Sequence, residues 1–115
     1  MLPKENRLKK RDEFNLVFKE GRSVGNKFLE IKKKSVKGKK IAFVAPVKVF
    51  KKATERNRVK RKLRESFRPF LSRIDSDIGL IFIARKSIRS KSVEEIEEIV
   101  EDLLVRLKIL KKNDR

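Results

Sequence analysis

The chain of 115 residues contains no cysteine, histidine, tryptophan or tyrosine. Without cysteine there are no disulfides and no thiolate chemistry, and without both cysteine and histidine the usual zinc sites are excluded. The lack of histidine also excludes imidazole acid–base catalysis and Ser-His-Asp triads. If the chain stacks nucleic-acid bases, that role falls to its 8 phenylalanines or to arginine.

Long hydrophobic runs are also absent. No stretch approaches the roughly 18 apolar residues that a membrane-spanning helix needs, so we expect no membrane partner. Residues 1–7 lack the apolar segment of a secretory signal. We therefore expect a cytoplasmic location, and we expect no small-molecule substrate.

The charge is strongly one-sided, with 34 Lys and Arg against 16 Asp and Glu, a net charge of +18. Such an imbalance causes self-repulsion that a polyanionic partner relieves. The length suits one domain, which we assign to residues 1–115 with a core over about 7–110. The hydrophobic fraction of 38% is arranged periodically, which favours a folded chain over a disordered one.

Residues 56–68 combine high charge with a regular apolar pattern. They hold seven cations and one carboxylate, yet Val59, Leu63 and Phe67 recur at every fourth position. That spacing places the three apolar side chains on one stripe of a helix. The pattern predicts a helix docked on a folded core with a fixed cationic face, and it favours RNA as the partner.

The cations of this helix are unevenly distributed around the apolar stripe. Arg58 and Lys62 fall on one side, near Glu65. The other flank carries Asn57, Lys60, Arg61, Arg64 and Arg68. Guanidinium groups match phosphate bidentately. The alternative is an ordinary solvated helix face, but such a face normally mixes the two signs because opposite charges at i,i+4 support a helix.

The first half of the chain predicts one helix and two strands. Residues 8–19 form the helix, with Gly21 as its stop. Residues 28–36 are predicted as a strand with Leu29 and Ile31 on one face. A hairpin turn at 37–40 leads to residues 41–50, which are apolar on both faces as in a central strand.

Two prolines mark expected ends of elements. Pro46 cannot donate to a sheet, so it predicts a bulge or the end of the second strand. The basic helix is expected over residues 53–67, because Pro69 disfavours its continuation. A third buried strand is expected at 78–84.

The final helix shows the clearest periodicity. Ser92 and Glu95 can form a capping box at its start. Its apolar face consists of Val93, Ile96, Ile99, Val100, Leu103, Leu104, Leu107 and Leu110. The acidic residues of its outer face repel phosphate, so we assign this helix a structural role. Together these elements predict an α+β fold.

The order of these elements around the basic motif resembles the bacterial ribonuclease P protein subunit. Residues 56–65, Arg-Asn-Arg-Val-Lys-Arg-Lys-Leu-Arg-Glu, are similar to the signature "RNR" helix of that family. The segment 7–21 is similar to its opening helix, Ala53 precedes the motif as it often does in the family, and 77–86 resembles the following strand with its "ARK" tract.

The resemblance implies a single two-layer α+β domain. Its sheet is mainly antiparallel, and a left-handed strand–helix–strand crossover carries the RNR helix. Family members bind ribonuclease P RNA and assist removal of the 5′ leader from precursor tRNA. Catalysis belongs to the RNA and its Mg²⁺, so the resemblance implies a non-catalytic subunit. We assign no cofactor to the protein itself, and the sequence leaves open whether it contacts Mg²⁺ at the junction with the RNA.

The resemblance also assigns two surfaces. The catalytic RNA is bound by the motif helix, with candidates Arg56, Asn57, Arg58, Lys60, Arg61, Arg64 and Arg68. The leader is held in a cleft between the opening helix and the sheet, with candidates Phe14, Phe18, Phe28 and Lys48. For each phenylalanine the alternative is core packing. The segment 45–52 departs from the family pattern, because it lacks glycine and contains Pro46.

Two other classes of protein remain open. A ribosome-associated RNA-binding protein would bind ribosomal RNA and show no preference for a leader. A protein-only nuclease would need a metal-binding carboxylate cluster. Asp75 and Asp77 lie close together in sequence, whereas the acidic residues of 94–102 indicate a solvated helix face. The basic helix matches no helix-turn-helix spacing, which disfavours a DNA-binding protein.

Overall fold

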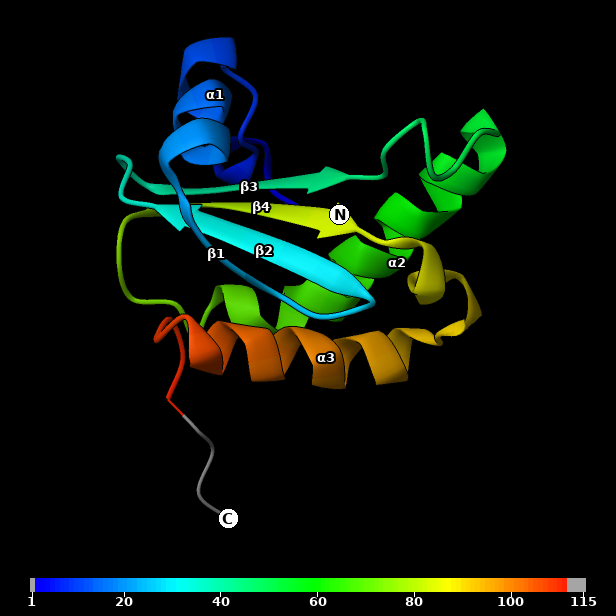
Figure 1. Ribbon diagram of the computed structural model, residues 1–115. Helices are drawn as coiled ribbons and strands as arrows, with labels where there is room; N and C mark the ends of the chain where they lie inside the picture. The colour runs from blue at the N-terminus through cyan, green and yellow to red at the C-terminus, as the bar shows by residue number, and fades with distance from the viewer. Residues whose placement is uncertain (1, 112–115) are drawn as a thin grey trace.

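In the computed structural model, residues 2–111 are described, and they form a four-stranded sheet with helices on both faces (Figure 1). The elements, in chain order, are η1 Lys4–Asn6, α1 Arg11–Glu20, β1 Arg22–Gly25, β2 Leu29–Lys34, β3 Lys39–Val44, α2 Ala53–Leu71, β4 Ile78–Ala84, η2 Lys86–Ser90 and α3 Val93–Arg106. None of the described helices is long and apolar enough to cross a membrane.

The sheet has the strand order β1-β2-β4-β3. β1 with β2 and β2 with β4 are antiparallel, whereas β3 and β4 are parallel. The parallel pair is joined through α2, which confirms a strand–helix–strand crossover that carries the basic helix. The predicted α+β class with a mainly antiparallel sheet is therefore confirmed.

The helices divide between the two faces of the sheet. α2 and α3 pack together on one face, and α1 lies across the other (Figure 1). The two layers expected from the resemblance are the sheet and the pair of helices α2 and α3. α1 covers part of the opposite face, where Val17 packs with Leu8 and Ile81 in a smaller apolar cluster.

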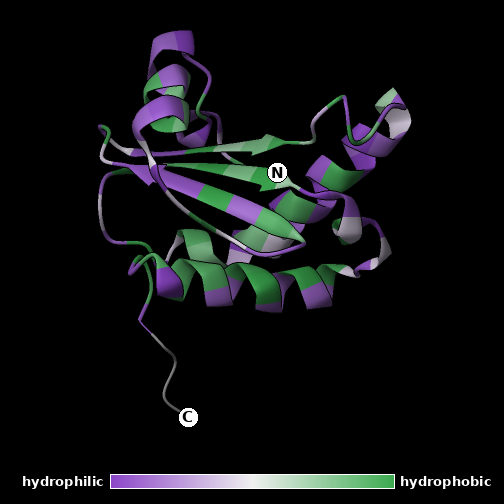
Figure 2. Ribbon diagram, viewed as in Figure 1, coloured by the Kyte–Doolittle hydropathy of each residue, from purple (hydrophilic) through white to green (hydrophobic). Residues whose placement is uncertain are grey.

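The main core lies between the sheet and the α2–α3 layer. Val59, Leu63 and Phe67 are buried there, as the four-residue spacing predicted. The ring of Phe67 meets that of Phe82 edge-on with centroids 5.1 Å apart. Figure 2 shows β4 as a hydrophobic strand and α3 with alternating hydrophobic and hydrophilic bands, in agreement with one buried and one exposed face.

The predicted hairpin at residues 37–40 is wrong. β2 and β3 are consecutive in the chain, but β4 lies between them in the sheet. Gly38 still makes a turn with a positive φ of 80°, a conformation that favours glycine. The predicted strand 78–84 is confirmed. It is the central strand that is buried on both faces, a position that the sequence had assigned to residues 41–50.

β3 is an edge strand and is shorter than predicted. It ends at Val44, and the carbonyl of Pro46 accepts hydrogen bonds from the amides of Val49 and Phe50 in the turn that follows. This outcome confirms Pro46 as the marker of the strand's end. Apolar side chains on both faces of β3 reflect the two cores, one on each side of the sheet.

The open edge of β3 is covered by the N-terminal segment. Arg7 forms a parallel bridge with Ile41, and the amide of Leu8 donates to the Ile41 carbonyl at 2.8 Å. Because Arg7 and Lys10 both have an extended backbone, α1 begins at Arg11 and not at residue 8 as predicted. The pairing also shields a strand edge that is otherwise free to aggregate.

Two helix ends have causes other than those predicted. Gly21 follows α1 with an ordinary φ of −67°, but a Cβ there would lie 2.3 Å from the Val17 carbonyl oxygen, so the close approach requires glycine. α2 continues through Pro69 to Leu71. Pro69 is on the exposed side of the helix, while its neighbour Phe70 is buried in the core. Burial of Phe70 thus favours another turn of helix despite the missing amide of Pro69.

α3 begins as predicted and ends earlier. Ser92 and Glu95 form the capping box in both directions. The helix stops at Arg106 because Lys108 has a φ of 61°, although Leu107 and Leu110 remain buried. The Leu107 carbonyl accepts a hydrogen bond from Lys33 Nζ. Burial lowers the pKa of Lys33, and the charges of Arg22 and Lys108 lower it further.

β1 was not predicted from the sequence. Its four residues, Arg22–Gly25, are too few and too polar to show a strand pattern. They form a strand because they pair with β2 in a regular antiparallel register. The Asn26 side chain accepts hydrogen bonds from the amides of Phe28 and Leu29, which fixes the connection between the two strands.

Candidate RNA-binding surfaces

The basic flank of α2 faces the solvent beside the edge of β3. Asn57, Arg61 and Arg68 are exposed, and Lys60 and Arg64 are half-buried. This group was predicted from helical spacing alone, and α2 holds it rigidly because the opposite stripe is buried. We call these five residues the α2 flank. The cations among them lie close together and repel one another, and a bound polyanion would relieve this repulsion.

The N-terminal segment extends the α2 flank. Lys60 and Arg64 line a hollow of about 360 Å³ together with Arg7. The remaining lining comes from Leu2, Ile41, Ala42 and Phe43. Arg7 is oriented by a 3.0 Å hydrogen bond from its Nε to the Leu2 carbonyl. The sequence did not predict Arg7 at this surface, because no local pattern relates residue 7 to a helix that begins only at Ala53.

Arg56 and Lys62 are engaged by the protein itself. Arg56 Nη1 donates to the carbonyls of Phe50 and Lys51, both at 2.9 Å. Lys62 Nζ donates to the Lys91 carbonyl at 3.1 Å. Arg56 was predicted to bind RNA, but these contacts give it a clear structural role in holding the loop before α2.

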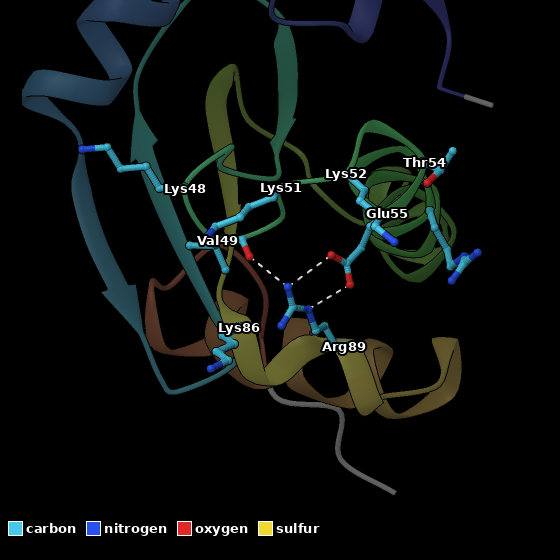
Figure 3. A pocket seen from close by; sticks show the side chains of 9 residues that line it. Lys48, Val49, Lys51, Lys52, Thr54, Glu55, Lys86 and Arg89 are labelled. Carbon is cyan, nitrogen blue, oxygen red and sulfur yellow. Dashed lines mark hydrogen bonds and ion pairs between the residues drawn. The ribbon is translucent and has the colours of Figure 1, made fainter.

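Arg58 belongs to a second basic area at the start of α2. It lines a hollow of about 890 Å³ between the loop 46–52, α2 and η2 (Figure 3). The side chains around this hollow are Lys48, Val49, Lys51, Lys52, Thr54, Glu55, Arg58, Lys86 and Arg89. We call it the loop–helix hollow. The sequence indicated Lys48 and Arg58 as binding candidates but not Lys86, which was placed only in the "ARK" tract, nor Arg89, which no motif marks.

The α1 side of the sheet carries the predicted aromatic pair. Phe14 and Phe18 stack with centroids 5.9 Å apart and planes 15° apart. Phe18 is 43% exposed, whereas Phe14 is half-buried against the smaller core. Lys32 Nζ of β2 lies 5.2 Å from the centroid of the Phe18 ring. This arrangement offers an exposed aromatic ring with a cation over it, a combination of stacking group and positive charge that suits a nucleotide. We call these three residues the α1 aromatic surface.

Phe28 does not join the α1 aromatic surface. Its half-buried ring packs against the main core on the other side of the sheet. Lys91 Nζ lies 4.9 Å from its centroid and Lys27 Nζ lies 5.1 Å from it. The structure therefore brings together Phe14 and Phe18 and leaves Phe28 with the core, the alternative that the sequence had left open.

Carboxylates do not gather as a metal site requires. Within residues 2–111, no three Asp or Glu side chains come together in a group that could hold a metal ion. Several of them pair with cations instead, such as Glu30 with Lys32 and Glu55 with Arg89. The residues seen here therefore offer surfaces for binding a polyanion and no carboxylate cluster.

Taken together, a rigid cationic helix, a basic hollow and an exposed aromatic pair define a small RNA-binding protein of α+β fold. The sequence profile of the Ribonuclease P family matches residues 2–108. The chain thus belongs to the ribonuclease P protein family, which serves in 5′ maturation of tRNA as part of an endoribonuclease complex.

Individual relatives agree with this assignment. The chain is 33% identical to the ribonuclease P protein component of Alkaliphilus metalliredigens, covering 91% of this chain and 96% of the relative. It is 37% identical to that of Bacillus mycoides over 84% and 86% of the two chains. In both cases the similarity extends over most of the relative's length, so it concerns the whole protein and not a single motif.

Solved structures show the same fold. The RNase P protein of Staphylococcus aureus superimposes with a TM-score of 0.80 at 26% identity, covering 94% of this chain and 100% of the other. That of Thermotoga maritima gives a TM-score of 0.65 at 32% identity, with 95% and 98% covered. The expected family and fold are therefore confirmed.

Proposed function

We propose that this protein binds ribonuclease P RNA through the α2 flank and holds the 5′ leader of precursor tRNA on the α1 aromatic surface. The RNA subunit carries the catalysis in this proposal, and the protein raises the affinity for the substrate. We also propose that this activity takes place in the cytoplasm.

The observation that carries the proposal is the separation of the two surfaces. Residues 2–8 and β3 lie between them, with Leu2 packed in the main core and Leu8 in the smaller core beneath α1. One large RNA and one single strand can therefore be bound at the same time. A single basic patch would not distinguish the two ligands.

The chemistry of each surface fits its proposed ligand. The α2 flank presents arginine and lysine at fixed spacing, which suits the phosphates of a folded RNA. The α1 aromatic surface has a stacking ring and one cation, which suits unpaired nucleotides of any sequence because every base has a π-face. A leader that differs among precursors requires such tolerance.

We assign the Mg²⁺ needed for cleavage to the RNA subunit. Neutralisation of crowded phosphates by the protein is expected to lower the Mg²⁺ concentration that the RNA requires. The protein-only nuclease has no support from the described carboxylates, and the match to the ribonuclease P family disfavours a ribosome-associated protein.

A binding experiment tests the proposal. The affinities of precursor tRNA and of mature tRNA are measured with ribonuclease P RNA alone and with the RNA–protein complex, at fixed salt. We expect the protein to increase the affinity for the precursor more than that for the mature tRNA. An equal increase for both would contradict a leader site on this protein.

A further inference from the structure

Three consecutive carbonyls in the loop before α2 accept hydrogen bonds from two arginines. Arg56 of α2 donates to the carbonyls of Phe50 and Lys51, and Arg89 of η2 donates to that of Val49 at 2.9 Å. The two donors come from different elements, on either side of the loop. The backbone of the loop 46–52 is thereby tied to both α2 and η2.

Arg89 is held in turn by Glu55 in the first turn of α2. Arg89 Nε lies 2.9 Å from Glu55 Oε2, and Arg89 Nη2 donates to Glu55 Oε1 at 3.1 Å, a two-point contact (Figure 3). The guanidinium also lies 5.2 Å from the centroid of the fully buried Phe50 ring. One side chain thus joins η2, the loop and the start of α2.

Glu55 is an unfavourable residue for a surface that binds RNA. It is the one carboxylate among the side chains of the loop–helix hollow, which otherwise presents six cations. A carboxylate there weakens the attraction for phosphate. An exposed ion pair alone contributes little to stability. Glu55 thus lowers the positive charge of the hollow, and its contact with Arg89 holds the loop in a fixed position.

We propose that Glu55 and Arg89 form a positioning pair that fixes Lys48 and its loop relative to α2, and so holds the cations of the loop–helix hollow in place to bind the phosphates of the precursor. This inference rests on the proposed function. The loop carries Lys48, Lys51 and Lys52, and Figure 3 shows Lys48 directed away from the Glu55–Arg89 contact. Positioning of this kind reduces the ordering that binding would otherwise require.

The first test uses the free protein and needs no RNA. Amide hydrogen exchange is measured in Glu55→Gln and Arg89→Lys variants. Glu101→Gln is the matched control, since Glu101 of α3 also pairs with an arginine, Arg73. We expect faster exchange at Val49 and Phe50 in the two test variants, with α3 unchanged. Exchange rates equal to those of the wild type would overturn the positioning role.

The second test separates position from charge in the RNA–protein complex. Glu55→Gln removes a negative charge, so a surface acting by charge alone would bind precursor tRNA more tightly. Arg89→Lys keeps the net charge but loses the two-point contact. We expect both variants to bind precursor about tenfold more weakly, the scale of one lost hydrogen bond to a charged group. Their affinity for ribonuclease P RNA should stay within about twofold.

The outcomes distinguish this inference from the proposed function. Tighter precursor binding by Glu55→Gln, or no change in Arg89→Lys, would overturn the positioning pair. An equal loss of affinity for ribonuclease P RNA and for precursor would also overturn it, because such a loss indicates general destabilisation. If the wild-type protein shows no preference for precursor, the proposed leader site fails, while the exchange experiment still decides whether the pair fixes the loop.

Discussion

Phe18 lies one helical turn after Phe14, and the two rings stack with their planes only 15° apart. The inner ring is anchored on the smaller core and the outer one is 43% exposed. An exposed ring normally lowers solubility, yet this one is stacked on Phe14 and has the ammonium group of Lys32 over it. The pair therefore forms a rigid surface on which an unpaired base can stack.

Replacement of Phe18 by alanine is expected to weaken binding of precursor tRNA by about 1–3 kcal/mol, because one base loses its stacking partner. Affinity for mature tRNA and for ribonuclease P RNA should change little. The control is Leu16→Ala, which removes another exposed apolar side chain of α1. If Phe18→Ala weakens binding of precursor and of ribonuclease P RNA equally, the two-surface account is contradicted.

Replacement of Arg61 and Arg64 by alanine is expected to weaken binding of ribonuclease P RNA and to reduce its salt dependence. Each lost phosphate contact lowers the slope of log K against log salt by about 0.7–0.9. Titration at several salt concentrations measures this slope. Arg106→Ala, at the end of α3 beside Asp102, is the control for the loss of a cation outside α2 and should leave the slope unchanged.

Arg56 is expected to affect stability more than its neighbours on the same helix. Its replacement by alanine removes the donor to the Phe50 and Lys51 carbonyls. Loss of hydrogen bonds to a charged group should reduce the free energy of unfolding by about 1.5–3 kcal/mol. Urea denaturation compares Arg56→Ala with Arg61→Ala, an exposed cation of α2. Equal stabilities would show that the loop does not depend on Arg56.

Glu95 is expected to make the stability of the protein depend on pH. The hydrogen bond from the Ser92 backbone lowers the pKa of Glu95 below its usual value of 4.5, and the Ser92 side chain adds to this effect. A carboxyl whose folded-state pKa is lowered stabilises the fold above the unfolded-state pKa, and this contribution is lost as the pH falls through the folded-state pKa.

The capping box can therefore be tested by denaturation between neutral pH and values below 4.5. The loss of stability with acid should be smaller in Glu95→Gln than in the wild type. Glu98→Gln, on the same helix outside the box, serves as the control and should lose stability like the wild type. Identical acid dependence in wild type and Glu95→Gln would exclude a role for the capping box.

Features that depend on neighbouring residues in the chain could be predicted. The buried stripe of α2 follows from Val59, Leu63 and Phe67, and the capping box follows from Ser92 and Glu95. These patterns are local, because helical geometry fixes which side chains share a face. The central strand 78–84 could also be predicted, because its sequence is a continuous apolar run.

Features that depend on pairing across the chain could not be predicted from local patterns. The insertion of β4 between β2 and β3 leaves no mark in the turn at 37–40, which looks like a hairpin. The short strand β1 exists only through its pairing with β2. Arg7 and Arg89 reach the candidate surfaces through tertiary contacts, so the sequence gives no periodic signal for either.

The most direct measurement is cleavage of a precursor tRNA with a 5′ leader by a bacterial-type ribonuclease P RNA at low Mg²⁺, with and without this protein. The account predicts cleavage at the 5′ end of the mature tRNA that appears only when the protein is added. Unchanged cleavage, with tight binding of the protein to ribosomal RNA in the same buffer, would contradict it.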